Sequence, residues 1–172
     1  MPPDEFADIV REHEAMVFRV LRRMVGRGDL DDLAQDVFLR LYRALPHFEQ
    51  RAQLSTYLYR ITLNVARDEW RRRRAARRDE SLTDPRTTWE KRLSDQAERA
   101  DEALERRQLW EIVQHCLPDL SEPERAALVL YHQEERSYDE IARIMQMPIG
   151  TVRTHLHRGR ERLGRLVQER LR

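Results

Sequence analysis

Apolar residues recur at three- and four-residue spacing along most of this chain, a pattern typical of amphipathic helices. One such stretch covers residues 6–24 and ends at Gly26, and a second covers 29–45, where Pro46 ends it. A third stretch follows Ser55, a candidate helix cap. Its expected buried line consists of Leu58, Ile61, Thr62 and Val65. Glycine is scarce and alternating β-branched runs are nearly absent, so the pattern predicts an all-α fold.

The second half of the chain repeats the helical pattern with clearer start signals. A helix is predicted from Leu104 to Cys116, and another after the capping-box spacing of Ser121 and Glu124. Two short helices joined by a tight turn are predicted over residues 137–163. The first starts at a capping box formed by Ser137 and Glu140, and the second follows Pro148-Ile149-Gly150 and has the apolar stripe Val152, Leu156 and Leu163. This order predicts a helix-turn-helix that reads DNA with its second helix.

The segment between the two halves differs in composition. It is polar and acidic, contains Pro85, lacks a sustained apolar stripe, and has Trp89 as an isolated aromatic residue. We therefore predict two small helical domains, 1–78 and 104–172, joined by a flexible acidic linker over 79–103.

Charge is strongly segregated, although the net charge of the 172 residues is only +1. Residues 57–78 contain eight arginines against two acids, and residues 150–172 contain seven arginines against two glutamates. Residues 79–105 and 119–140 are each acidic. Two basic surfaces separated by acidic material favour a nucleic-acid partner. Lys91 is the only lysine, which suits phosphate binding through guanidinium groups but also fits a GC-rich genome.

Composition also excludes several classes of protein. Cys116, the single cysteine, rules out an internal disulfide or a cysteine-cluster zinc site, and its helical neighbours predict a role in packing. We expect no metal or other cofactor. The chain has neither an apolar run that would span a bilayer nor an amino-terminal secretory pattern, so we expect a cytoplasmic protein without membrane insertion.

The chain resembles an extracytoplasmic-function (group IV) sigma factor of bacterial RNA polymerase, in the sigma-70 family, over nearly its whole length. The matching residues of the first half are Asp31-Asp32, Gln35-Asp36-Val37-Phe38, Thr56-Tyr57-Leu58, Arg60-Ile61, Asn64 and Asp68, followed by the arginine run. Those of the second half are Leu117-Pro118, Glu124-Arg125, Ser137-Tyr138, Glu140-Ile141-Ala142, Pro148, Gly150-Thr151-Val152, Leu156, Arg158, Arg160 and Leu163.

The resemblance implies a promoter-specificity subunit that binds core RNA polymerase at its clamp helices and flap, reads promoter DNA as duplex and as melted strand, and is controlled by an anti-sigma factor. The implied polymerase-binding residues are Asp31, Asp32, Gln35, Asp36, Phe38 and Arg40. Those implied for the minus-ten element and single-stranded DNA are Tyr57, Arg60, Asn64, Arg67, Trp70, Arg71 and Arg74. Those implied for the minus-thirty-five element are Thr151, Arg153, Thr154, His155 and Arg158. Two positions depart from the family pattern: His155 commonly is arginine, and Gly159 commonly is alanine and should soften the helix.

Three other classes of function compete with this interpretation. An enzyme is disfavoured because no HExxH, glycine-rich phosphate loop, GxSxG or metal-spaced cluster occurs, and His155 and His157 lie on different helix faces. A polymerase-independent helix-turn-helix regulator would explain the second half but leave the first without a ligand pocket. An RNA-binding adaptor would share the arginines but lacks a recognised RNA module.

Overall fold

The structure is a computed structural model that describes residues 3–26, 28–48, 53–79 and 102–172. Within these ranges every regular element is a helix and no strand occurs, which confirms the all-α prediction. Most of the segment predicted as a linker, including Trp89, lies outside the described residues. No helix among the described residues is long and apolar enough to span a bilayer.

Three helices and a short 3-10 turn form the amino-terminal bundle. They are α1 (Pro3–Val25), α2 (Leu30–Ala44), η1 (Leu45–His47) and α3 (Leu54–Asp79). Gly26 ends α1 in the left-handed conformation with φ of 76°, and its N–H donates to the Arg22 carbonyl at 2.9 Å. The side chain of Asp29 caps α2 by accepting from the Asp32 N–H at 3.4 Å.

The apolar stripes of the three helices meet in one core. The buried residues include Val17, Val20 and Leu21 of α1, Val37 and Leu41 of α2, and Leu58, Ile61, Thr62 and Val65 of α3. The stripe predicted for α3 is therefore buried as a whole. The predicted cap at Ser55 is wrong, because the helix already begins at Leu54 and the Tyr57 N–H reaches back to the Gln53 carbonyl at 3.2 Å.

The carboxy-terminal bundle contains α5 (Glu102–Cys116), η3 (Leu117–Asp119), α6 (Glu122–His132), α7 (Tyr138–Met145) and α8 (Ile149–Arg170). The predicted capping box at α7 is present: the Glu140 carboxylate accepts from the Ser137 N–H at 2.8 Å, and the Ser137 hydroxyl accepts from the Glu140 N–H at 3.3 Å. The chain then turns through Gln146, which adopts a left-handed φ of 54°, and enters α8 after Pro148.

Of the three glycines of α8, only Gly159 packs closely against α6. It is buried, and a Cβ added to it would lie 3.1 Å from Leu128 Cδ1 and 3.2 Å from Leu128 Cγ. The helix is continuous through this position to Arg170. The structure therefore gives Gly159 a packing reason that the sequence alone did not suggest.

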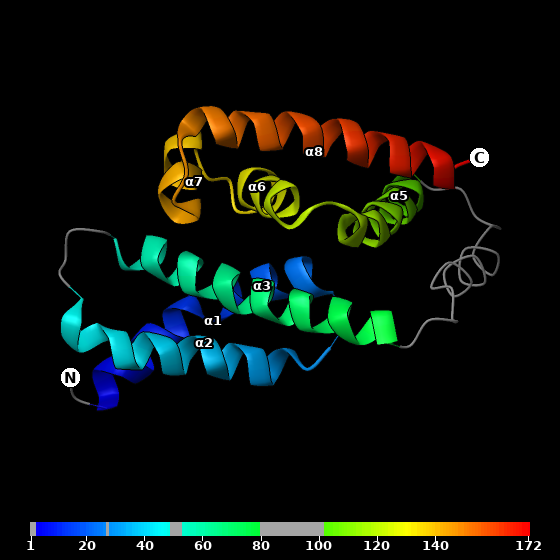
Figure 1. Cartoon of the computed structure of the whole chain (residues 1–172). Coiled ribbons are helices and arrows are strands. Elements are labelled where there is room, and N and C mark those ends of the chain that lie inside the picture. Colours follow the sequence, from blue (N-terminus) through cyan, green and yellow to red (C-terminus); the bar gives the residue numbers. More distant parts are fainter. Residues whose placement is uncertain (1–2, 27, 49–52, 80–101) are drawn as a thin grey trace.

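The two bundles pack against each other along α3 and α1. Figure 1 shows the carboxy-terminal bundle lying over the amino-terminal one, on the side where α3 lies. α7 packs on α3, and α6 packs on α1. Most buried apolar residues of the two bundles belong to one continuous cluster, whereas Ile112 and Cys116 of α5 lie outside it. The two halves of the sequence thus share a core instead of meeting only through their polar surfaces.

Candidate nucleic-acid interface

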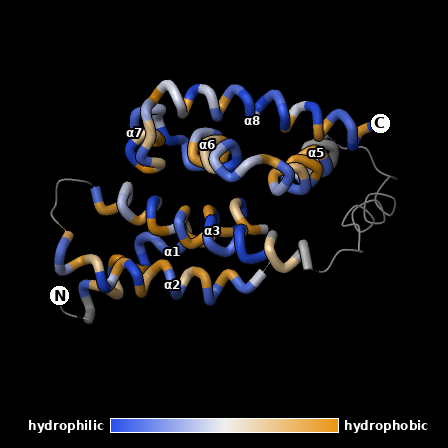
Figure 2. The backbone as a smooth tube through the Cα atoms, viewed as in Figure 1, coloured by the Kyte–Doolittle hydropathy of each residue, from blue (hydrophilic) through white to orange (hydrophobic). Residues whose placement is uncertain are grey.

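The first turns of α8 present a polar, basic face to solvent. In Figure 2 this helix is mostly hydrophilic, while Val152 and Leu156 on its inner side are buried. The exposed predicted DNA-contacting residues are Thr151, Arg153, Thr154 and Arg158. His155 is only half exposed. Arginine and threonine side chains on the free face of a helix can reach phosphates and base edges in a major groove.

Local contacts already orient two of these side chains. The Thr154 hydroxyl donates to the Gly150 carbonyl at 3.0 Å, so its oxygen remains available as an acceptor. The Arg153 guanidinium lies 5.9 Å from the centroid of the Tyr138 ring on α7. A residue of α7 therefore contacts one of the exposed arginines of α8.

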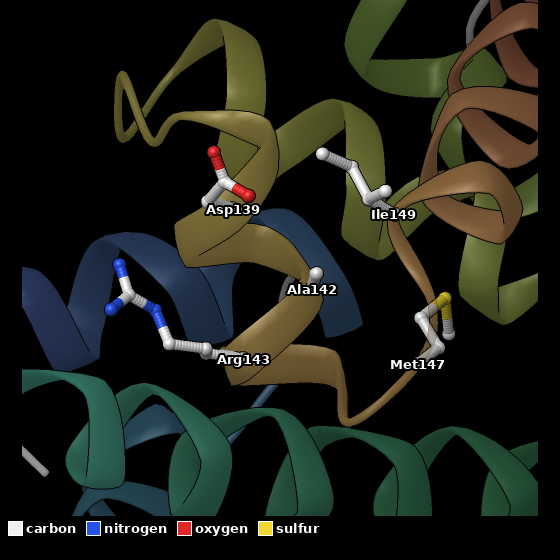
Figure 3. A pocket seen from close by; sticks show the side chains of 5 residues that line it. All are labelled: Asp139, Ala142, Arg143, Met147 and Ile149. Carbon is white, nitrogen blue, oxygen red and sulfur yellow. The ribbon is translucent and has the colours of Figure 1, made fainter.

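A shallow, open hollow of about 530 Å³ adjoins the turn between α7 and α8. Figure 3 shows its lining residues, which are Asp139, Ala142, Arg143, Met147 and Ile149. The lining combines one acid, one base and small or apolar side chains, and it holds no cluster of nucleophile and base. The hollow thus offers no arrangement for catalysis.

The predicted single-strand surface on α3 divides into two parts. Asn64 and Arg71 are exposed, whereas Tyr57 and Arg60 are half buried. The Tyr57 ring lies 5.2 Å from that of Phe48, and the Arg60 guanidinium lies 5.9 Å from the Tyr57 centroid. These residues form one small aromatic and basic patch near the start of α3.

The second part of that surface contacts the carboxy-terminal bundle. Arg67 forms an ion pair with Glu122, with 3.1 Å between Nε and Oε1, and the Arg125 guanidinium lies 5.4 Å from the Trp70 ring. Two predicted strand-binding residues are therefore partly covered in this arrangement. The side chain of Arg74 lies outside the described part of the chain.

The predicted polymerase face on α2 is open to solvent. Asp31, Asp32 and Gln35 are exposed at its start, and Asp36 pairs with Arg40 at 2.9 Å. Phe38 is half buried and packs against the core. Leu39 and Tyr42 are about half exposed, at 48% and 52%. This face combines an acidic helix start with exposed apolar side chains.

Sequence reasoning missed the charged residues that join the bundles. Glu134, which follows α6, is buried and accepts hydrogen bonds from Arg19 of α1 and Tyr59 of α3. Arg125 of α6 is also buried and donates to the Met24 carbonyl at 2.7 Å. The partners lie far apart in sequence. The opposite charge of the arginine-rich block 57–78 and the acidic block 119–140 agrees with the Arg67–Glu122 ion pair, but it gives no signal for the partners of Glu134 and Arg125.

Other titratable side chains in the described part of the chain are packed away or dispersed. Cys116 is buried, as predicted, and burial raises the pKa of its thiol, which keeps it protonated. Among the described residues, no group of three or more histidine, cysteine or acidic side chains could hold a metal ion.

Comparison with known proteins identifies the class of both bundles. The family model for Sigma-70 region 2 matches residues 9–76, and the model for Sigma-70 region 4 matches residues 110–163. Together these models cover more than half of the chain, in the order of the two bundles.

Relatives match over nearly the full length. The chain is 30% identical to the ECF RNA polymerase sigma factor SigW of Bacillus subtilis, covering 96% of this chain and 90% of SigW. It is 34% identical to the RNA polymerase sigma-H factor of Pseudomonas aeruginosa, covering 95% and 86% of the two chains. It is 30% identical to the ECF sigma-E factor of Escherichia coli K12, covering 95% and 87%. The chain therefore belongs to the extracytoplasmic-function sigma factors of the sigma-70 family.

Solved structures share the fold. The structure of CnrH in complex with the cytosolic domain of CnrY matches with a TM-score of 0.68 and 25% identity, covering 98% of this chain and 90% of that one. The sigma factor RpoE in complex with the anti-sigma factor NepR from Bartonella quintana matches with a TM-score of 0.68 and 21% identity, covering 95% and 97%. Sigma factors are subunits for transcription initiation, so the chain is a promoter-recognising protein by class.

Proposed function

We propose that this protein is a dissociable, group IV promoter-specificity subunit that binds core RNA polymerase, recognises the minus-thirty-five and minus-ten elements, and starts DNA melting. Polymerase itself performs the chemistry. The observation that carries the proposal is the occurrence of both sigma-70 regions in one chain, each with an exposed basic helix face. We place the domains at 1–78 and 104–172, with a linker over 79–103.

The minus-thirty-five element is assigned to the start of α8. Arg153 and Arg158 supply donors for guanine edges or phosphates, and the methyl group of Thr154 supplies an apolar contact for thymine. Thr151 is exposed in the first turn, where α8 directs backbone N–H groups outward. His155, half buried, is assigned a phosphate contact because an imidazole reaches less far than the arginine common in relatives.

The minus-ten element and the melted strand are assigned to α3. Unstacking a base step costs a few kcal/mol, so melting requires favourable sites for the exposed bases. Aromatic side chains provide such sites at about 1–3 kcal/mol per stacked base, and arginines neutralise the strand. Tyr57 and Trp70 have the stacking role in this proposal, and Asn64 reads a base edge.

Core polymerase is assigned to α2. Its exposed acidic start, Asp31 and Asp32, complements a basic helical partner such as the clamp helices, and the neighbouring Leu39 and Tyr42 add apolar contact area. Region 4 supplies the contact to the flap. These contacts place the protein in the cytoplasm with its polymerase.

An anti-sigma factor is the proposed regulator. Two structural neighbours, CnrH and RpoE, were solved with CnrY and with the anti-sigma factor NepR, respectively. An inhibitor of this kind would act by covering surfaces of both bundles at once.

The test is run-off transcription with core polymerase, with and without this protein, on fragmented DNA from a high-GC bacterium, followed by mapping of the starts. New discrete starts that share two spaced motifs are the expected result. A protein freed of any co-purified inhibitor that neither binds core nor creates starts would contradict the proposal and favour a polymerase-independent regulator.

A further inference from the structure

One buried carboxylate ties the two bundles together. Glu134 lies in the turn between α6 and α7, and its side chain is only 3% exposed. It accepts from Arg19 Nε at 3.1 Å and Arg19 Nη2 at 3.0 Å, a two-pronged ion pair with α1. It also accepts from the Tyr59 hydroxyl of α3 at 2.8 Å. A single residue of the carboxy-terminal bundle thus holds two helices of the amino-terminal one.

The surroundings of Tyr59 fit this role. The phenol is buried, and burial together with the Glu134 hydrogen bond raises its pKa well above the ordinary value, so the hydroxyl stays a donor. The Arg136 guanidinium lies 5.7 Å from its ring centroid. The Glu134 carboxylate and the Arg136 guanidinium therefore both contact Tyr59. If this tyrosine were exposed, it would extend the stacking surface on α3.

The same interface covers two residues assigned to the melted strand. Glu122 pairs with Arg67, an arginine assigned to a DNA phosphate, and the Arg125 guanidinium lies over the Trp70 ring, which is assigned to a stacked base. Bound DNA would need the positions that these two side chains occupy. The acidic start of α2, by contrast, stays exposed.

The packed bundles are also too small to reach both promoter elements at once. A compact chain of this size has a radius of gyration of about 16 Å, hence a diameter of about 40 Å. Centres of elements near minus ten and minus thirty-five lie about 25 base pairs apart, roughly 85 Å at about 3.4 Å per pair. The bundles must separate before both elements can be read.

The interface contains a built-in weakness. Arg125 is 1% exposed, and its Nε and Nη2 have no hydrogen-bond partner among the described residues. Burial lowers its pKa to about 10, so the group is still charged near neutral pH. The Arg125 guanidinium contacts a carbonyl and a ring, and Glu122 and Asp119 attract its charge without forming an ion pair with it among the described residues. A buried charge without a close carboxylate weakens the packing and leaves it reversible.

We propose that the free protein inhibits itself: the carboxy-terminal bundle, latched by Glu134 to Arg19 and Tyr59, covers part of the single-strand surface until it is displaced. The inhibitory role rests on the proposed function of α3, whereas the latch itself does not. Polymerase favours the open state only to the extent that it binds that state more tightly, through its second contact between the flap and the carboxy-terminal bundle.

The experiment compares full-length wild type with Glu134→Gln and with Glu135→Gln, the same change at the adjacent exposed residue. Small-angle X-ray scattering should show a radius of gyration larger by about a fifth or more for Glu134→Gln than for the wild type, because separated bundles are less compact than a single globular domain of this length. Glu135→Gln should leave the radius of gyration unchanged. Arg19→Gln, at a largely exposed side chain, opens the latch from the other bundle and covers the case in which Glu134→Gln fails to fold. Circular dichroism verifies helical content in each variant.

Binding of a fluorescent mixed-sequence single-stranded oligonucleotide tests the inhibitory role. If about 90% of the wild type is closed, opening should tighten binding roughly tenfold, while Glu135→Gln should bind as the wild type does. An extended wild type, or equal compactness of both glutamate variants, would overturn the latch. Opening without tighter binding would overturn the inhibition. Failure of the proposed function would look different, because no variant would direct transcription starts while scattering still responded to Glu134.

Discussion

Two glycines of α8 show how tightly different parts of this helix are packed. Gly159 and Gly164 both lie inside this helix, but only Gly159 is buried against Leu128; a Cβ at Gly164 would meet nothing within 4 Å. Changing either glycine to alanine gains about 1 kcal/mol from helix propensity. At Gly159 the new methyl group lies 3.1 Å from Leu128 Cδ1, and overpacking of this kind costs about 1–3 kcal/mol.

We therefore expect Gly164→Ala to raise the free energy of unfolding by about 1 kcal/mol, a shift in Tm of roughly 2–4 °C. Gly159→Ala should be at least about 1 kcal/mol less stable than Gly164→Ala, because the overpacking offsets the propensity gain. Urea unfolding of the full chain, followed by circular dichroism, measures both. Equal stabilisation by the two changes would refute the reasoning, since Leu128 would then yield without cost.

Other predictions concern caps and surfaces. Ser137→Ala should lower the free energy of unfolding by about 1 kcal/mol through loss of the α7 cap, measured by urea titration. The hydrogen bond from the Ser137 N–H lowers the pKa of Glu140 below its ordinary 4.5, so this stabilisation is present above that value and is lost as the pH falls below it; Glu140→Gln should remove that part of the acid sensitivity in the same titration. Asp32→Arg should impair assembly with core polymerase in gel filtration, and normal assembly would contradict the α2 assignment. Arg158→Ala should weaken binding to a minus-thirty-five duplex by about 1–3 kcal/mol in fluorescence anisotropy, whereas Arg165→Ala, further along α8, should change it little.

Local rules explain why the helices could be predicted. Gly26 ends α1, Pro46 lies in the turn after α2, and Ser137 starts α7 because each acts on the backbone within a few residues of itself. Ser55 shows the limit of such rules. Neighbouring residues can also serve as the start of a helix, and α3 begins at Leu54, one residue before this serine.

Side-chain exposure on α3 shows a second limit. Its periodicity correctly predicted the burial of Leu58 but left Tyr59 out of the buried line, and the structure leaves Tyr59 only 5% exposed. Helical spacing assigns a residue to a face of its own helix. It carries no information about which other domain covers that face.

The sequence by itself determined the helices, their apolar faces, the charge blocks and the family, because these depend on spacing and residue type. Only the tertiary structure revealed the closed packing of the bundles, the buried pairs of Glu134 and Arg125, and the close approach at Gly159. The physical reason is sequence separation. The Arg19–Glu134 contact joins residues 115 positions apart, and neither side chain differs in sequence from an ordinary exposed charge.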